Sequence, residues 1–143
     1  MRENFDKFFD LTVMQFEGGS RYTNDADDPG GETKYGISKR SNPDLDIARL
    51  TKDQAKEIYR QRYWGPIGAD DMPYPWDMIV ADAAVNMGVS RAVGLKGKAA
   101  TPCEFHMERI AYYCNLVEMK PIMQKYHRGW INRVNNLWKA TKE

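Results

Sequence analysis

The sequence has no long hydrophobic run and very few residues that form disulfides or bind metals. None of its apolar stretches approaches the roughly 18 residues that a membrane-spanning helix needs. Only two cysteines and two histidines occur in 143 residues. Neither His106 nor His127 stands at a familiar metal-ligand spacing from Cys103 or Cys114. We therefore expect no stable membrane insertion, no bound metal and no other cofactor.

The few cysteines and the N-terminus both bear on the compartment. Cys103 and Cys114 fall in one predicted helix, about 16 Å apart along its axis, so they cannot form a disulfide with each other. We expect two free, buried thiols, which are typical of a reducing compartment. Glu3 and Asp6 stand near the N-terminus, which lacks the basic and apolar regions of a signal peptide. We therefore expect synthesis in the cytoplasm.

Acidic side chains are scarce in the last part of the chain. Residues 1–88 sum to a charge of −5 and residues 89–143 to +6, although the whole chain is only +1. A basic C-terminal part could face nucleic acid, an anionic membrane or an anionic polymer, or it could be a solvated helix face. The length and an apolar content of 42% fit one domain with one core.

The apolar pattern predicts several helices and one irregular region. Helical spacing covers residues 4–17, and Gly18 and Gly19 end that segment. Residues 20–50 have few apolar side chains and many turn formers, which indicates a loop or short hairpin region. Further helices are predicted over residues 51–64, 76–87 and 101–119 and from Pro121, with only a short piece from Ser90 before the third of these. We predict a mainly α (α+β) fold with a small β-hairpin or irregular loop region after the first helix.

Glu17 stands at the end of the first predicted helix, directly before two glycines. The negative end of the helix dipole and the apolar neighbour Phe16 would both raise the pKa of its carboxyl group. A glutamic acid that is still protonated near neutral pH can serve as a general acid. Glycoside hydrolysis requires such an acid as one member of a carboxylate pair. A glutamate in this position is, however, also common as a plain surface residue.

The second carboxylate of such a pair must stay ionised, and a polar loop suits it. Asp25, Asp27 and Asp28 all lie in the loop region. An EF-hand calcium site counted from Asp25 would place Pro29 and Gly36 where ligands are needed. A calcium site of that type is therefore not expected.

A series of short motifs in this order resembles glycoside hydrolase family 108, a family of lysozyme-like N-acetylmuramidases found largely in bacteriophages and prophages. The motifs are Glu17-Gly18-Gly19, Asp28-Pro29-Gly30-Gly31, Thr33, Tyr35-Gly36-Ile37, Tyr63-Trp64, Asp82, Val85-Asn86-Met87-Gly88 and Gly129-Trp130-Ile131-Asn132-Arg133. The resemblance implies a single lysozyme-like domain over residues 1–143. Within it, residues 1–88 would be the catalytic part, and residues 89–143 would be a helical part resembling a peptidoglycan-binding region.

The resemblance also implies roles for individual residues. It makes Glu17 the catalytic acid, Asp28 the second carboxylate and Thr33 a residue that positions water. Asp27 remains a rival to Asp28, because related phage lysozymes often separate the aspartate and the threonine by five residues. Thr33 could equally be a turn or capping residue. Here Ser20 and Arg21 lengthen the loop that follows the glycines.

Three further residues are candidates for binding a sugar. Tyr22 and Tyr35 could stack on pyranose faces or merely anchor the loop. Asn86 could hydrogen-bond an N-acetyl group or satisfy a helix-end carbonyl. Arg133 is expected to be available to solvent or ligand, and Asp82, within an apolar helix, needs an unidentified partner.

The resemblance, together with the position of Glu17, implies a phage-type lysozyme, an endolysin that hydrolyses the β-1,4 bond between N-acetylmuramic acid and N-acetylglucosamine and lyses the host, an antimicrobial action. Its partners would be peptidoglycan glycan strands and a holin-type permeabilising protein that opens the way to the cell wall. We expect a monomer that binds no nucleic acid. The alternatives are a lytic transglycosylase on the same bond and a non-catalytic peptidoglycan-binding or secretion-promoting module.

Overall fold

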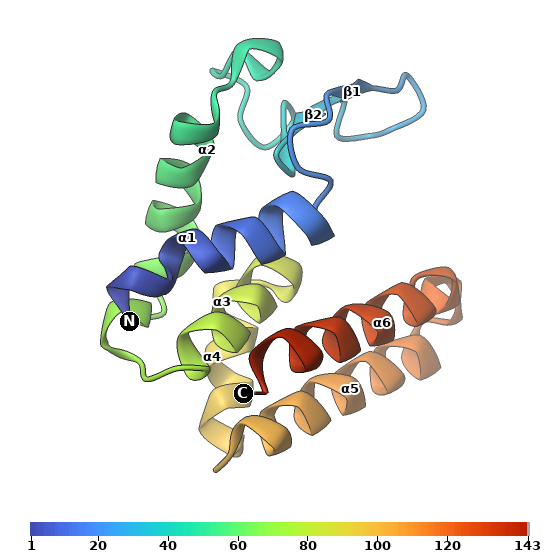
Figure 1. Ribbon diagram of the computed structural model, residues 1–143. Helices are drawn as coiled ribbons and strands as arrows, with labels where there is room; N and C mark the ends of the chain where they lie inside the picture. The colour runs from blue at the N-terminus through green and yellow to red at the C-terminus, as the bar shows by residue number, and fades with distance from the viewer. Residues whose placement is uncertain (143) are drawn as a thin grey trace.

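The computed structural model describes residues 1–142, and the first helical segment runs from near the N-terminus to the edge of the β region (Figure 1). Its apolar face is buried, with Phe8, Phe9 and Val13 fully shielded from solvent. This confirms the predicted amphipathic helix. The segment comprises the 3-10 helix η1 (Arg2–Asn4), the α-helix α1 (Phe5–Phe8) and the π-helix η2 (Phe9–Phe16).

A small antiparallel sheet follows the first helix and lies beyond its C-terminal end (Figure 1). The central strand pairs with both neighbours, so Thr33 faces Thr23 on one side and Ser38 on the other. The predicted hairpin region is thus present as a three-stranded meander. Its elements are β1 (Thr23–Asn24), β2 (Glu32–Lys34) and β3 (Ile37–Ser38), followed by the 3-10 helix η3 (Ile47–Arg49).

The next helix begins at the predicted capping box. The Thr51 hydroxyl accepts from the Gln54 backbone N–H, and the Gln54 side chain accepts from the Thr51 N–H. The helix ends in a π-helical turn that buries Trp64 against the rings of Phe5 and Phe8. The elements here are α2 (Lys52–Tyr59), the π-helix η4 (Arg60–Trp64) and the 3-10 helix η5 (Ala69–Asp71).

Helix α3 (Trp76–Met87) lies at the centre of the molecule and is buried from Asp77 to Ala84, as its apolar sequence predicts. Gly88 ends it with a positive φ of 96°. The chain then forms α4 (Val89–Lys98), a ten-residue helix packed on α3, where the sequence suggested only a short piece. Gly94 and Gly97 lie within α4 and weaken the helical signal, because glycine is a poor helix former.

Two long antiparallel helices complete the fold and lie side by side (Figure 1). They are α5 (Pro102–Met119) and α6 (Gln124–Thr141), joined through the 3-10 helix η6 (Pro121–Met123). Only one face of α5 is covered, and Cys103 and Cys114 lie on its exposed side. Both thiols are free, but the expectation that they are buried is wrong. Helices with one small sheet confirm the predicted mainly α fold.

Candidate active site

Glu17 follows directly on the last residue of η2 and stands where the chain leaves the helix. Its backbone N–H donates to the Thr12 carbonyl at 3.0 Å, which extends the π-helical pattern to this residue. Gly18 and Gly19 then adopt φ angles of 88° and 58°, which glycine tolerates best. A side chain at Gly19 would place its β-carbon 2.9 Å from the Met14 carbonyl oxygen. The Gly-Gly pair therefore fixes the direction in which the chain turns after Glu17.

The carboxylate of Glu17 is paired with an arginine from the far end of the sequence. Arg133 on α6 donates from Nη1 to Glu17 Oε1 at 2.6 Å, and the two side chains are only 10% and 27% exposed. The Arg133 guanidinium also lies over the Phe16 ring, 5.3 Å from its centroid. The expectation that Arg133 is available to solvent is wrong, because α6 packs so that this side chain points inward.

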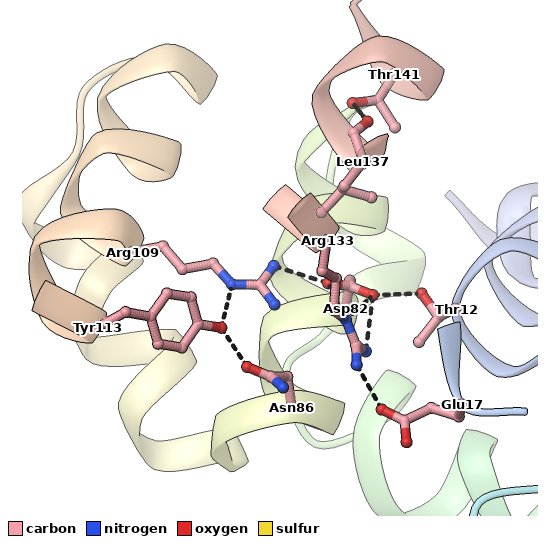
Figure 2. A network of polar contacts seen from close by, with 9 residues as sticks. All are labelled: Thr12, Glu17, Asp82, Asn86, Arg109, Tyr113, Arg133, Leu137 and Thr141. Carbon is pink, nitrogen blue, oxygen red and sulfur yellow. Dashed lines mark hydrogen bonds and ion pairs between the residues drawn. The ribbon is translucent and has the colours of Figure 1, made fainter. Parts of the chain in front are cut away.

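The buried carboxylate of Asp82 holds Arg133 in place (Figure 2). Asp82 lies on α3 with no exposed surface and accepts from Arg133 Nη2 at 3.0 Å and from Arg109 Nη1 at 2.7 Å. The Thr12 hydroxyl donates to it at 2.8 Å. Burial raises the pKa of Asp82, but the charges of Arg109 and Arg133 outweigh this effect and lower it. The sequence argument that Asp82 needs a partner is confirmed.

The same network raises the pKa of Arg133 above its ordinary value. Burial alone would lower it, but the charge of Asp82 and the ion pair with Glu17 outweigh the desolvation. Arg133 is thus a permanent cation between two carboxylates. One of these, Asp82, is fully buried and the other, Glu17, reaches the surface.

A tight turn of the β region covers the opposite side of Glu17. Tyr35 and Gly36 have φ angles of 53° and 70°, and the Tyr59 hydroxyl donates to the Tyr35 carbonyl at 2.7 Å. A β-carbon added at Gly36 would stand 2.6 Å from the Tyr59 hydroxyl and 3.1 Å from the Glu17 β-carbon. Burial, followed by the negative charge of Glu17, raises the pKa of the Tyr59 phenol.

Glu17 opens onto a pocket of about 400 Å³ between the end of the first helix and α6. Amide side chains dominate its polar lining, and Glu17 is the only carboxylate among the described residues that line it. Trp130 stacks on Tyr113 with ring centroids 4.9 Å apart and forms one wall. The lining residues are Gln15, Phe16, Glu17, Asn86, Gly129, Trp130, Asn132, Arg133 and Asn136.

Asn86 is the predicted sugar-binding residue that the structure brings next to Glu17. It comes from the last turn of α3 and lines the same pocket. Its Oδ1 accepts a hydrogen bond from the Tyr113 hydroxyl, and that hydroxyl in turn accepts from Arg109 Nε at 2.9 Å. Arg109, which also contacts Asp82, therefore helps to orient the Asn86 amide through the Tyr113 hydroxyl.

The predicted second carboxylate lies on the exposed loop between β1 and β2. Asp28 accepts from the Gly30 N–H at 2.8 Å, and the Asp27 N–H donates to Asp25 at 2.9 Å. Within residues 1–142, no hydrogen bond or ion pair joins either aspartate to Glu17. Both carboxylates occupy the polar, hydrated setting that the sequence argument required.

The remaining predicted residues occupy different environments within the β region. Thr33 sits on β2 and donates to the Gly31 carbonyl at 3.4 Å. Tyr22 is 41% exposed and donates to Glu32 at 2.7 Å. Tyr35 is only 7% exposed and its ring packs against Phe9. Of the two roles left open for Tyr35, this placement favours anchoring the loop over stacking on a sugar.

The part of the chain that the structure covers contains neither a metal-binding cluster nor a membrane-spanning helix. Residues 1–142 contain no group of three or more histidine, cysteine, aspartate or glutamate side chains placed to hold a metal ion. Nor does any helix in this range combine the length and the apolar character needed to cross a bilayer.

Comparisons with known proteins agree with this fold. The structure of SagA from Brucella abortus is similar, with a TM-score of 0.76 at 23% sequence identity, over 98% of this chain and 94% of that one. No curated protein matches the sequence. The model of the family described as glycosyl hydrolase 108 matches residues 11–88, more than half of the chain and including Glu17, Asp28, Asp82 and Asn86. The chain therefore belongs to the glycosyl hydrolase 108 family.

Proposed function

We propose that this glycoside hydrolase is a phage-type lysozyme, an endolysin that cleaves the β-1,4 bond between N-acetylmuramic acid and N-acetylglucosamine. Family membership supports lysozyme-like hydrolysis of peptidoglycan in general. The observation that carries the finer proposal is the placement of Glu17, partly exposed at a polar pocket with one carboxylate oxygen held by Arg133. Such a carboxyl group can reach the glycosidic oxygen of a chain lying across the pocket.

In this mechanism Glu17 is the general acid. Its proton passes to the oxygen that joins the two sugars, and the electron pair of the broken C1–O bond goes to that oxygen. Water then supplies hydroxide to the oxocarbenium-like C1, and its remaining proton returns to a carboxylate. Asp28 would orient this water or stabilise the cationic transition state, with Asp27 as its rival. Thr33 would help to position the water.

The amides of the pocket suit a substrate that carries acetamido groups. Asn86, Asn132 and Asn136 line the pocket together with Gln15. An amide side chain can donate to an acetyl carbonyl and accept from an acetamido N–H at the same time. Trp130 in the pocket and Tyr22 on the exposed side of the β region would be the aromatic residues that contact the apolar side of a pyranose.

The two parts of the chain would have different roles at the cell wall. Residues 1–88 would form the catalytic part, and the helical part from residue 89 onward, with its excess of basic side chains, would contact anionic peptidoglycan. The enzyme would be made in the host cytoplasm as a monomer and would reach the wall through a holin-type permeabilising protein. Lysis of producing cells should then depend on co-expression of such a protein.

A lytic transglycosylase remains a second candidate for one specific reason. Glu17 is the only carboxylate among the described pocket residues. A transglycosylase needs only one such group, because the 6-hydroxyl of the muramic acid replaces water as the nucleophile. Its products carry an anhydro ring and are lighter than hydrolysis products by the mass of one water.

The test is digestion of purified peptidoglycan by the wild type and by Glu17→Gln, Asp27→Asn and Asp28→Asn, with products analysed by mass spectrometry. We expect Glu17→Gln to abolish cleavage while the protein stays folded and still sediments with peptidoglycan. The exposed Glu118 provides a matched control, and Glu118→Gln should cleave normally. Unchanged cleavage by Glu17→Gln would reject the proposed acid. Folded wild type that binds peptidoglycan without cleaving it would favour the non-catalytic module, and anhydro products would favour the transglycosylase.

A further inference from the structure

Arg133 makes two different kinds of contact with its one planar group (Figure 2). Its Nε donates to Asp82 Oδ2 at 3.2 Å, and its Nη2 donates to Asp82 Oδ1 at 3.0 Å. One edge of the guanidinium therefore makes a bidentate contact with the buried carboxylate. Its Nη1 points the other way and donates to Glu17 Oε1 at 2.6 Å. Because the guanidinium is rigid and planar, fixing one edge on Asp82 also fixes the direction of Nη1.

The charged groups around Glu17 come from three different helices. Arg133 comes from α6, Asp82 from α3 and Arg109 from α5, and the uncharged Tyr59 phenol comes from α2. The covering turn contributes Gly36, which carries no charge. Asp82 faces two arginines and neutralises only one of their charges. An ionised Glu17 neutralises the other.

The two oxygens of Glu17 are consequently not equivalent. Oε1 accepts a hydrogen bond from the Arg133 N–H, so a proton on Oε1 could not be directed toward Arg133. Oε2 stands on the other side, 3.6 Å from the position of a β-carbon at Gly36, and takes part in no hydrogen bond within residues 1–142. A protonated Glu17 can keep Oε1 on Arg133 as a carbonyl acceptor and carry its proton on Oε2.

We propose that Arg133, held by Asp82, is a positioning residue that fixes Glu17 through Oε1 and presents Oε2 as the oxygen that donates the proton. The inference rests on the proposed role of Glu17 as the acid. When the proton leaves Oε2 for the glycosidic oxygen, the negative charge that forms on Glu17 is already in contact with Arg133. The ion pair thus favours the carboxylate that the reaction produces, and no rearrangement of the site is needed.

Arg133→Gln and Arg133→Lys test this role, with Arg128→Gln as a matched control. Arg128 is exposed on the same helix, so its variant loses the same charge without touching the site. Arg133→Gln should lower kcat about 10- to 100-fold, in line with the loss of a charge-assisted hydrogen bond, and change KM little.

Arg133→Lys keeps the charge but loses the two-edged geometry. We expect kcat to remain reduced and KM to change little, because a lysine cannot engage Asp82 and Glu17 in the same plane. Arg128→Gln should match the wild type in kcat. An Arg133→Lys enzyme with full kcat would overturn the proposal. This variant remains informative if Arg133→Gln does not fold.

A measurement without substrate separates this inference from the proposed function. In protein labelled with ¹³C at glutamate carboxyl groups, the Glu17 signal is assigned by its loss in Glu17→Gln. At one pH, its chemical shift should differ between Arg133→Gln and the wild type and stay unchanged in Arg128→Gln, because only Arg133 contacts the carboxyl group. An unchanged shift in Arg133→Gln would refute the role of Arg133 even in an active enzyme. A changed shift in a protein that cleaves no peptidoglycan would support the contact between Arg133 and Glu17 and reject the proposed function.

Discussion

Replacing Gly36 by alanine should damage the fold and the site together. At φ 70°, an L-residue loses about 1 kcal/mol relative to glycine. The added β-carbon would stand 2.6 Å from the Tyr59 hydroxyl and 3.1 Å from the Glu17 β-carbon, too close for either group to keep its place. Overpacking of this kind costs about 1 to 3 kcal/mol, and moving Tyr59 breaks its hydrogen bond to the Tyr35 carbonyl, worth about 1 kcal/mol. The total is about 3 to 5 kcal/mol.

Gly31→Ala separates the backbone cost from the collision. Gly31 has nearly the same φ, 69°, but an added β-carbon there meets no atom within 4 Å. Urea unfolding should therefore give a loss of about 1 kcal/mol for Gly31→Ala and about 2 to 4 kcal/mol more for Gly36→Ala. Cleavage of peptidoglycan should fall in Gly36→Ala, because that change displaces Glu17. Equal free energies of unfolding for the two variants would refute the argument that Gly36 is required by its neighbours.

Two further predictions concern buried groups. Burial lowers the pKa of His106 to about 4 from its ordinary 6.5, so the stability that the neutral ring contributes is complete above about pH 6.5 and declines as the pH falls from there toward 4. The loss amounts to about 3 kcal/mol, and His106→Phe should show a correspondingly smaller loss when urea unfolding is compared at pH 7 and pH 4. Thr12→Val removes a 2.8 Å hydrogen bond to the buried Asp82. It should lower the free energy of unfolding by about 1 to 3 kcal/mol, while Thr12→Ser, which keeps the hydroxyl, should lose clearly less in the same thermal or urea experiment.

The parts of the fold that the sequence predicted are those set by neighbouring residues. The capping box at Thr51 and Gln54, the start of α5 at Pro102 and the end of α3 at Gly88 all depend on side chains within a few positions. Each is confirmed. Helix α4 was underestimated for the same local reason, because its glycines weaken the helical pattern while its packing on α3 stabilises it.

The candidate site was predicted only in part, because its central contacts span long distances in sequence. Glu17 could be selected from its helix end and its motif, and Asp82 could be identified as a residue that needs a partner. The identity of that partner depends on how α6 packs, since Arg133 lies 51 residues from Asp82 and 116 from Glu17. The inward direction of Arg133 has one local signal, its position one residue before the buried Val134 and four before the buried Leu137.

The span of the Glu17–Arg133 contact has a consequence for synthesis on the ribosome. A nascent chain that contains everything up to Lys120 already includes Glu17, Asp82 and Arg109, yet it lacks α6 and thus the cation that orients the acid. Its glutamate has no such restraint until α6 has emerged and docked. Translation order alone would therefore separate the synthesis of the acid from its orientation by the 116 residues between Glu17 and Arg133.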